Sequence, residues 1–572
     1  MDRRQTVFLS VAAIFCTLAL MLTAPACNRS TPEASKETKP TELKSTTREG
    51  RNAPWLKNLG KFERKISTTS PEAQHFFNQG LTLYYGFNHE EAVRSFKEAA
   101  RLDPQCAMAF WGEAISLGPN INDSFPDEER EKQAYAALQK ALELKQGSNE
   151  TEQELIDALV PRYSKAKPAR RQPLNVAYAQ AMTKVYQRFP EDPDVATLYA
   201  EAVMDTMPWS YWTRDGRPQP GTKQLVAALE SVIAKYPEHP GANHLHIHAV
   251  EASPDPDRAV PSADRLGGLV PAAGHLVHMP CHIYIRVGRY EDAAEANRRA
   301  IRADEDYISQ CRAQGFYPVG YYPHNIHFLS AALSMMGQAE EAIAAARKVG
   351  EKSSHVGCGM QGLGFVHLLR AYPILALVRF GRWDEVMKEA AVETDSPFVK
   401  AMQHFGRGLA LKAKGELEKA EIELADLSAS LENKELAQMT VNDQNTLLQL
   451  SQIATEMLAG ELAARRGDTR RAVAHLKRGV TLEDKLIYSE PPDWPLPVRH
   501  SLGTVLLESD RAAEAERVYR EDLTRHRNNG WALFGLAKSL ESQGKVEAAA
   551  KVHEQFQQVW GKSGISLTAS RL

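Results

Sequence analysis

The stretch AQHFFNQGLTLYYGFNHEEAVRSFKEAARLDP, residues 73–104, decides the fold of this chain. Small residues stand at Gly80 and Ala92, an aromatic ring stands at Phe96, and Pro104 closes the stretch. Small side chains at matched places on two helices let the helices approach closely, and a large ring fills the space between them. The stretch therefore predicts a helix–turn–helix unit.

This arrangement resembles the tetratricopeptide repeat, a 34-residue helical hairpin that stacks into a solenoid. With Ala73 at position 1, the chain matches the repeat at positions 8, 20, 24, 27 and 32. The resemblance covers roughly residues 70–560 and implies an all-α fold, a right-handed superhelix of helix hairpins. Further units are expected to start at Pro193, Pro240, Gly274, Pro323, His367, Ala401, Ile453, Leu496 and Gly530.

Three segments depart from the repeat. Residues 119–190 and 428–452 are helical in pattern but match poorly, as degenerate repeats or spacer helices would. Residues 207–221 contain three prolines and two glycines and predict a loop. Its aromatic residues either plug a local core or form a lid or wall over a groove; they are Trp209, Tyr211 and Trp212.

Bulk composition narrows the function classes. Apolar residues make up 43% and charged residues 25% of the chain, as in soluble folded proteins. The formal net charge of −3 gives no basic footprint for nucleic acid. The sequence holds no G-x-x-x-x-G-K-[ST], H-E-x-x-H, G-x-S-x-G or C-x-x-C motif.

The N-terminus has the features of an export signal. Arg3 and Arg4 precede an apolar run, and Ala24-Pro25-Ala26 suits cleavage by a signal peptidase. Residues 1–26 followed by Cys27 resemble a bacterial lipoprotein signal, which implies lipidation of Cys27 and a membrane anchor. Asn28 favours the periplasmic side of the outer membrane. Because Ala24 replaces the usual leucine, plain secretion stays open.

The remainder divides by composition and repeat pattern. Residues 27–65 are rich in Thr, Ser, Lys, Glu and Pro and predict a flexible tether. Residues 66–360 predict an N-terminal solenoid with a histidine-rich groove, and residues 361–572 a C-terminal solenoid and cap. The four cysteines after Cys27 are too sparse for a disulfide scaffold; they are Cys106, Cys281, Cys311 and Cys358.

Histidines gather between residues 244 and 327. Two pairs, His244 with His278 and His248 with His282, are each 34 residues apart and so occupy equivalent places on neighbouring units. Apart from His246, the histidines within each helix step by three or four residues and share one face. The full set is His244, His246, His248, His275, His278, His282, His324 and His327.

The tetratricopeptide resemblance implies that positions 2, 5, 9, 12 and 13 of each first helix line the concave groove. Seven histidines fall on those positions, and His246 falls on a packing position. Glu251, at position 12, joins the groove set, and Glu201 and Asp205 lie on it one unit upstream. These three carboxylates are candidates for ligands, for partners of histidine N–H groups or for a general base.

Several imidazoles on one concavity predict a transition-metal site. A metal ion holds imidazoles in the neutral form, whereas their protonated forms would repel one another. Histidine with one carboxylate suits zinc, copper or iron. Eight candidate ligands exceed one tetrahedral shell, so either two ions bind or some histidines support the others. The predicted ligands are His244, His248, Glu251, His275, His278, His282, His324 and His327.

Residues near this set are predicted to have other roles. Cys281 falls on a packing position and is expected to be buried without binding metal, and Met279 lies off the groove face. Tyr317, Tyr321 and Tyr322 either border the pocket or pack. The glycine-rich stretch 356–364 predicts a connection, and His355 and Cys358 beside it are minor candidates for the groove.

Three passages, NHLHIHAVEASP (243–254), GHLVHMPCHIY (274–284) and YYPHNIHF (321–328), resemble a group of bacterial exported tetratricopeptide proteins. That resemblance implies the fold and the grouping of the histidines, and no particular reaction. Two functions follow. One is an exported metalloprotein with one or two ions, whose catalytic role the sequence leaves open. The other is a membrane-tethered adaptor that binds a peptide or partner protein in the groove.

Overall fold

The computed structural model describes residues 50–165, 168–313, 317–354 and 364–572. These residues fall within one compact unit. The predicted signal peptide, Cys27, His355 and Cys358 lie outside the described residues. Within them, no helix is long and apolar enough to cross a membrane.

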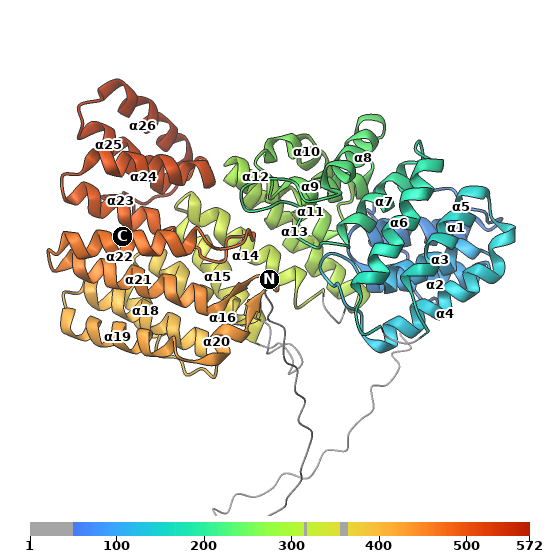
Figure 1. Ribbon diagram of the computed structural model, residues 1–572, viewed down its shortest axis with the longest axis horizontal. Helices are drawn as coiled ribbons and strands as arrows, with labels where there is room; N and C mark the ends of the chain where they lie inside the picture. The colour runs from blue at the N-terminus through green and yellow to red at the C-terminus, as the bar shows by residue number, and fades with distance from the viewer. Residues whose placement is uncertain (1–49, 166–167, 314–316, 355–363) are drawn as a thin grey trace, which may run out of the picture. The chain divides into compact units, whose positions relative to one another are not determined.

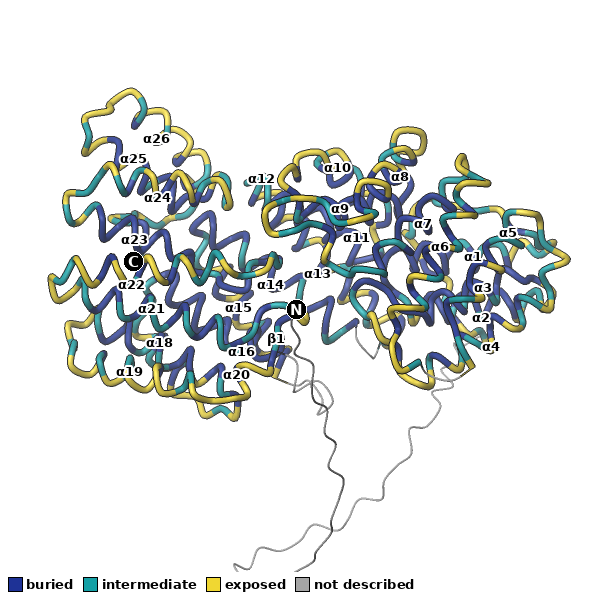
Figure 2. Tube along the Cα trace, viewed as in Figure 1, coloured by how far each residue is buried: buried dark blue, intermediate teal, exposed yellow. Residues whose placement is uncertain are grey.

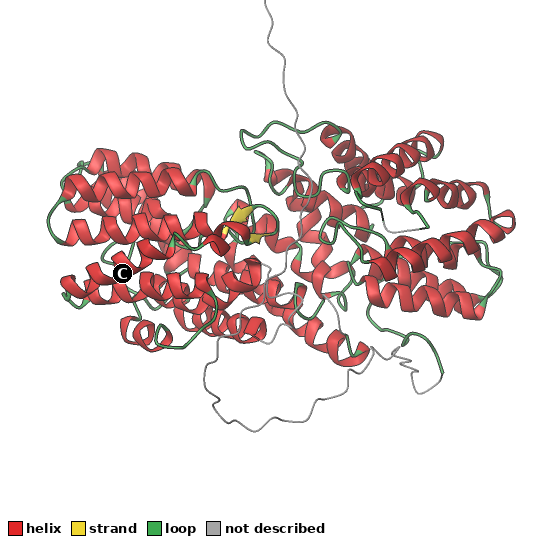
Figure 3. Ribbon diagram, turned by 60° about the horizontal axis from the view of Figure 1, so that its bottom comes forward, coloured by secondary structure: helices red, strands yellow, loops and turns green. Residues whose placement is uncertain are grey.

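The described chain is built almost wholly from α-helices (Figures 1 and 3). Helices of the first half are α1 (Pro71–Tyr85), α2 (His89–Leu102), α3 (Ala107–Leu117), α4 (Glu128–Leu144), α5 (Glu150–Ala158), α6 (Gln172–Arg188), α7 (Pro193–Met204), α8 (Thr222–Lys235), α9 (Pro240–Val250), α10 (Val260–Leu269), α11 (Gly274–His278), α12 (Pro280–Val287) and α13 (Tyr290–Cys311). Those that follow are α14 (Tyr321–Met335), α15 (Ala339–Ser354), α16 (Gly364–Arg379), α17 (Trp383–Glu389), α18 (Pro397–Ala413), α19 (Leu417–Ser430), α20 (Lys434–Gln438), α21 (Leu447–Arg465), α22 (Thr469–Glu483), α23 (Val498–Glu508), α24 (Ala512–Arg525), α25 (Gly530–Glu541) and α26 (Val546–Trp560). Short 3₁₀ turns are η1 (Lys145–Gly147), η2 (Val160–Arg162) and η3 (Pro256–Ala259).

Consecutive helices pack as antiparallel hairpins, which gives the predicted all-α solenoid of tetratricopeptide type. The predicted unit starts at Pro193, Pro240, Gly274 and Gly530 coincide with the first residues of α7, α9, α11 and α25. In Figure 2 the exposed segments gather on hairpin ends and on outer helices such as α19 and α26. The helix α15 also packs on α16 across the predicted division at residue 360.

Close helix approach depends on glycines that face an aromatic ring. A Cβ atom at Gly80 would lie 2.9 Å from the ring of Phe96, and one at Gly112 would lie 2.3 Å from it. Phe96 therefore fills the space between the hairpin α1–α2 and the next helix, α3. The same arrangement recurs at the C-terminal end, where Tyr519 lies against Gly503 and Gly535. The glycines of the repeat pattern thus allow neighbouring helix backbones to lie close together.

Two segments differ from expectation. Residues 428–452 contain a short antiparallel hairpin, β1 (Thr440–Val441) with β2 (Asn445–Thr446), in place of a continuous helix. Asn442 and Asp443 have φ angles of 50° and 57°. Their short polar side chains tolerate this left-handed conformation, which favours a turn over a helix.

The described part of the predicted tether, residues 50–65, packs on the solenoid. Ala53 and Leu56 are buried, and Trp55 stacks on His75 with ring centroids 3.5 Å apart. Arg64 forms ion pairs of 2.8 Å with Asp192 and with Asp194. Residues 50–65 are thus part of the folded unit, not of a tether.

The helices that carry most of the histidines lie inside the solenoid. Every residue of α9 and of α11 is buried. The segment between α22 and α23 reaches them from the C-terminal repeats, because the Tyr488 hydroxyl lies 3.3 Å from Glu251. Asn445 holds this segment in place through its hydrogen bonds with the backbone of Ile487, of 2.8 and 2.9 Å. A segment remote in the chain therefore covers the helices that carry these histidines.

Substitution of Gly112 by alanine should destabilise the fold by about 1–3 kcal/mol, because the new methyl group overlaps Phe96. Chemical denaturation of the two proteins measures the difference. The matched control is Gly147→Ala, where no atom lies within 4 Å of the added Cβ. An equal, small effect of both substitutions would contradict the packing described.

The ion pairs of Glu461 should make stability depend on pH. Burial alone would raise the pKa of Glu461, but Arg571 at 2.8 Å and Lys412 at 2.7 Å outweigh it and hold the pKa at about 2. Because the folded pKa is depressed, this contribution of about 3 kcal/mol is present above the unfolded pKa, near 4.5. It should disappear as the pH falls from there towards 2.

The measurement is the unfolding free energy of the wild type and of Glu461→Gln between pH 7 and pH 3. The two curves should converge as the pH falls. Glu418→Gln, at an exposed position, serves as the control and should leave the pH dependence unchanged. Parallel curves for wild type and Glu461→Gln would rule out the proposed role of these ion pairs.

Candidate metal centre

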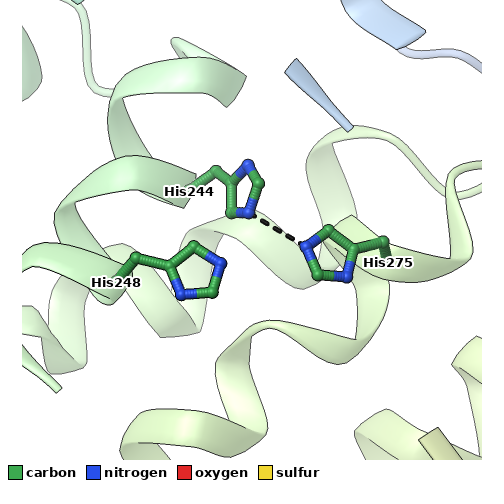
Figure 4. Close-up of side chains that lie close together, drawn as sticks. All are labelled: His244, His248 and His275. Atoms are coloured by element: carbon green, nitrogen blue, oxygen red, sulfur yellow. Dashed lines mark hydrogen bonds between the residues drawn. The ribbon is translucent and has the colours of Figure 1, made fainter. Parts of the chain in front are cut away.

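Six histidines from four helices form two groups of three. The first triad consists of His244 and His248 on α9 and His275 on α11; Figure 4 shows the three rings turned toward one another. The second triad consists of His278 on α11, His282 on α12 and His324 on α14. In each triad one ring nitrogen per residue lies within 4.8 Å of the other two. The sequence left open whether the histidines form one group or two, and the structure places six of them in two neighbouring groups.

In the first triad, hydrogen bonds on the outer side fix two tautomers. The Nδ1 atom of His244 lies 2.6 Å from the carbonyl oxygen of Tyr85, so Nδ1 carries the hydrogen and donates it. His248 donates from Nδ1 to Glu251 at 2.8 Å, and its Nε2 is buried with no hydrogen-bond partner among the described residues. Both Nε2 atoms therefore keep a lone pair.

The Nε2 atoms of His244 and His275 lie 3.1 Å apart. Because His244 Nε2 carries a lone pair, His275 donates to it when its hydrogen is on Nε2. His275 Nδ1 is buried without a hydrogen-bond partner among the described residues, so the tautomer with hydrogen on Nδ1 needs a cation in place of that hydrogen bond. In the tautomer with hydrogen on Nδ1, all three Nε2 lone pairs are free to bind a single cation.

In the second triad, hydrogen bonds fix the tautomers of both His278 and His282. Asn297 donates from Nδ2 to the Ala293 carbonyl at 2.8 Å, so its Oδ1 accepts from Nδ1 of His278 at 2.7 Å. His282 donates from Nδ1 to Glu251 at 2.6 Å. Both rings thus bear their lone pair on Nε2, and these two Nε2 atoms are 3.0 Å apart. Two lone pairs at this distance repel unless a cation lies between them.

The nitrogen spacing suits a shared ion. Two nitrogens bound at about 2.0–2.1 Å to one tetrahedral zinc ion lie about 3.3 Å apart. The measured 3.0 and 3.1 Å are close to that value. One pair of nitrogens in each triad therefore has the spacing of a shared ion, and the third nitrogen lies within 4.8 Å of both.

Glu251 joins the two triads. One carboxylate oxygen accepts from His248 of the first triad, and the other accepts from His282 of the second. The side chain of Glu251 is 1% exposed. Acceptance at Nδ1 fixes the ring orientation and raises the basicity of the opposite nitrogen. Glu251, predicted as a ligand or support, contacts both triads through His248 and His282.

Each triad lies against a phenyl ring. Phe87 contacts the three rings of the first triad at centroid distances of 4.5–6.0 Å. Phe328 contacts the three rings of the second triad at 4.6–4.9 Å. These apolar surfaces exclude water from the imidazoles and strengthen their interaction with a cation.

Two strained residues place aromatic rings on the first triad. Phe87 and Trp209 have φ angles of 57° and 61°, in the left-handed region that bulky residues rarely occupy. Trp209 meets His248 edge-on at 5.0 Å, and its Nε1 donates to the Ile121 carbonyl at 3.0 Å. The loop 207–221 therefore forms a wall of the site, one of its two predicted roles. Tyr211 is buried, and Trp212 donates to the Ala249 carbonyl at 2.7 Å.

Burial keeps the imidazoles neutral. It lowers the pKa of His244, His248, His282 and His324 to about 3, and it lowers the pKa of His275 and His278 well below the usual range. Neutral imidazole is the form that binds metals. The sequence placed these residues on an open groove, but five of the six are at most 2% exposed. They form an enclosed site, because the loop 207–221 and the segment containing Tyr488 cover it.

Other predicted residues lie apart from the triads. His327 contacts Tyr372 at a centroid distance of 4.2 Å and belongs to neither triad. His246 points into the repeat packing, where its Nδ1 lies 3.0 Å from Ser262. Cys281 is buried, with Sγ 3.2 Å from Nδ1 of His278. Of the three tyrosines, Tyr321 meets His275 at 4.8 Å; Met279, Tyr317 and Tyr322 are buried.

The upstream carboxylates form their own cluster. Glu201 accepts from the Tyr84 hydroxyl at 2.8 Å, and Asp205 pairs with Arg162 at 2.7 Å. Burial, followed by their mutual repulsion, raises the pKa of Glu201 to about 8; burial raises that of Asp205 to about 7. Neither belongs to a histidine group. Their predicted place beside the ligands is therefore not seen, because Tyr84 and Arg162 hold them.

Sequence reasoning missed a second carboxylate. Glu490 lies with its Oε2 3.8 Å from Nδ1 of His282, and it groups with Glu251 and His282. Burial, followed by repulsion from Glu251, raises its pKa well above the usual range. Phe87, Phe328 and Asn297 were also missed. Phe328, four residues after His324 on the same helix face, carried a usable signal, whereas Glu490 comes from a distant repeat.

The comparisons with known proteins add no functional assignment. No protein-family model matches the chain. No curated protein matches it either.

Solved structures of low similarity do align with the chain. They include the Cut9–Hcn1 hetero-tetramer of the APC/C (14% identity, TM-score 0.31) and a human IFIT1 dimer with m7Gppp-AAAA (13%, 0.31). Yeast Tom70 aligns with 12% identity and a TM-score of 0.27. Each alignment covers 86% of this chain and, in the same order, 74%, 91% and 91% of the other chain. Likeness of this size carries no argument about function.

Proposed function

We propose that this protein binds two transition-metal ions, one in each histidine triad. The observation that carries the proposal is the 3.0 Å approach of the two Nε2 atoms of His278 and His282. Both Nδ1 hydrogens are already donated, to Asn297 and to Glu251. The two Nε2 lone pairs repel each other at this distance, and a cation between them removes the repulsion.

The ligand chemistry narrows the class of metal. Three neutral imidazole nitrogens suit zinc, copper or iron and disfavour magnesium and calcium, which prefer oxygen. Three protein ligands leave one position open, the arrangement of metal sites that bind or activate a small molecule. The solenoid in this proposal is a scaffold that brings imidazoles from α9, α11, α12 and α14 together.

We further propose that the protein is exported and anchored through Cys27 to the outer membrane, on its periplasmic side. The support is the N-terminal signal pattern with Cys27 directly after Ala26. Such an anchor would place the metal centre in a compartment where metal ions reach it from outside the cytoplasm.

Metal content tests the main proposal. Protein purified without a histidine tag should carry, or take up on incubation with Zn²⁺, two ions per chain, measured by mass spectrometry of the elements. The variant His248→Ala with His282→Ala removes one ligand from each triad and should lower both affinities by at least about tenfold. His553→Ala, an exposed histidine outside the triads, should change neither.

A wild-type protein that binds no metal above the level of this double variant would refute the proposal. Capture of a partner by such metal-free protein would then favour the alternative, a scaffold that binds a peptide or protein.

Lipidation has its own test. Mass spectrometry of the mature N-terminus should find a diacylglycerol-modified Cys27, and Cys27→Ala should release the protein from the membrane fraction. A free, unmodified cysteine in protein that remains soluble would contradict the anchor and leave the metal proposal intact.

A further inference from the structure

The two triads lie as close to each other as the rings within them. His248 and His282 have centroids 5.5 Å apart, and His275 and His278 have centroids 5.9 Å apart. Within the triads the corresponding distances run from 4.9 to 6.0 Å. The six imidazoles therefore form one continuous cluster, and ions in the two triads would be neighbours.

The protein supplies little negative charge directly to such a pair. All six candidate ligands are neutral imidazoles. The oxygens of Glu251 accept hydrogen bonds from His248 and His282, so they face the outer edge of the ligands. Glu490 lies on the same outer side, near Nδ1 of His282. Two divalent ions in a buried, apolar setting repel strongly unless an anion lies between them.

The apolar side chains around the cluster favour a small anion over a large polar ligand. Phe87 and Phe328 cover one triad each, and Trp209 adds a wall beside His248. The phenyl rings of Phe87 and Phe328 offer no hydrogen-bonding groups to a large polar ligand. A single anionic ligand that both ions share would complete both triads and reduce the repulsion between the ions.

We propose that the two triads hold their ions as a coupled pair bridged by one small anion, which is hydroxide in water. The bridging place would also accept an oxygen of a small oxyanion such as phosphate. This inference rests on the proposed binding of two ions. Two neighbouring metal ions can position and polarise an oxyanion through the oxygen that they share.

Magnetic coupling in the copper-loaded protein tests the bridge. Wild type loaded with two Cu²⁺ per chain should give an integrated EPR signal far below its copper content, because a bridging anion pairs the two spins. His324→Ala weakens the second triad at a half-buried position and should give protein with one Cu²⁺ and a full signal. Asn297→Leu, which removes the support of His278, should do the same without deleting a ligand.

Inorganic phosphate or azide supplies a second readout. Either anion should shift the visible absorption of the two-copper protein more than that of the one-copper variants. Two bound Cu²⁺ with full, independent EPR signals would overturn the coupled pair while leaving the two-ion proposal in place. Binding of one Cu²⁺ per chain would overturn the pair as well, and absence of any binding would refute the proposed function itself.

Discussion

The centre depends on hydrogen bonds made by the outward nitrogens of its histidines. Glu251, Asn297 and the Tyr85 carbonyl accept from the Nδ1 atoms of four rings, and each bond turns an Nε2 lone pair inward. Without these acceptors the same rings would adopt tautomers that hydrogen-bond to one another. The acceptors lie on the far side of the rings from the lone pairs, so they act without filling the ligand positions.

The solenoid supports this arrangement because its repeats place equivalent residues on neighbouring helices. Helices α9 and α11 begin 34 residues apart, so His244 on α9 and His278 on α11 take equivalent places. Close packing through Gly80, Gly112 and Phe96 shows how small residues keep successive hairpins in contact. Contacts across the centre come from outside this regular part, since Trp209 lies in a loop and Tyr488 follows α22. Regular repeats bring the ligands together, and irregular segments enclose them.

The sequence predicted the fold and much of the histidine grouping from the 34-residue period, and it placed His324 from its position in the unit that starts at Pro323. Unit starts such as Pro240 and Gly530 fall at observed helix starts. The period could not show that the ligands divide into two triads, since the division depends on ring rotamers and on the break between α11 and α12 at Met279. It also could not place Glu490, which approaches His282 only through folding of distant repeats. Predicted groove positions proved to be buried because the loop 207–221 covers them.

The most direct test is to determine which ring nitrogen of each histidine carries the hydrogen in the metal-free protein. Nitrogen-15 NMR of selectively labelled histidine distinguishes a ring with hydrogen on Nδ1 from one with hydrogen on Nε2. We expect the Nδ1–H form, neutral at pH 7, for His248, His278 and His282. Rings with hydrogen on Nε2, or carrying a proton on both nitrogens, would contradict this expectation, because no lone pair would then face the place where an ion binds.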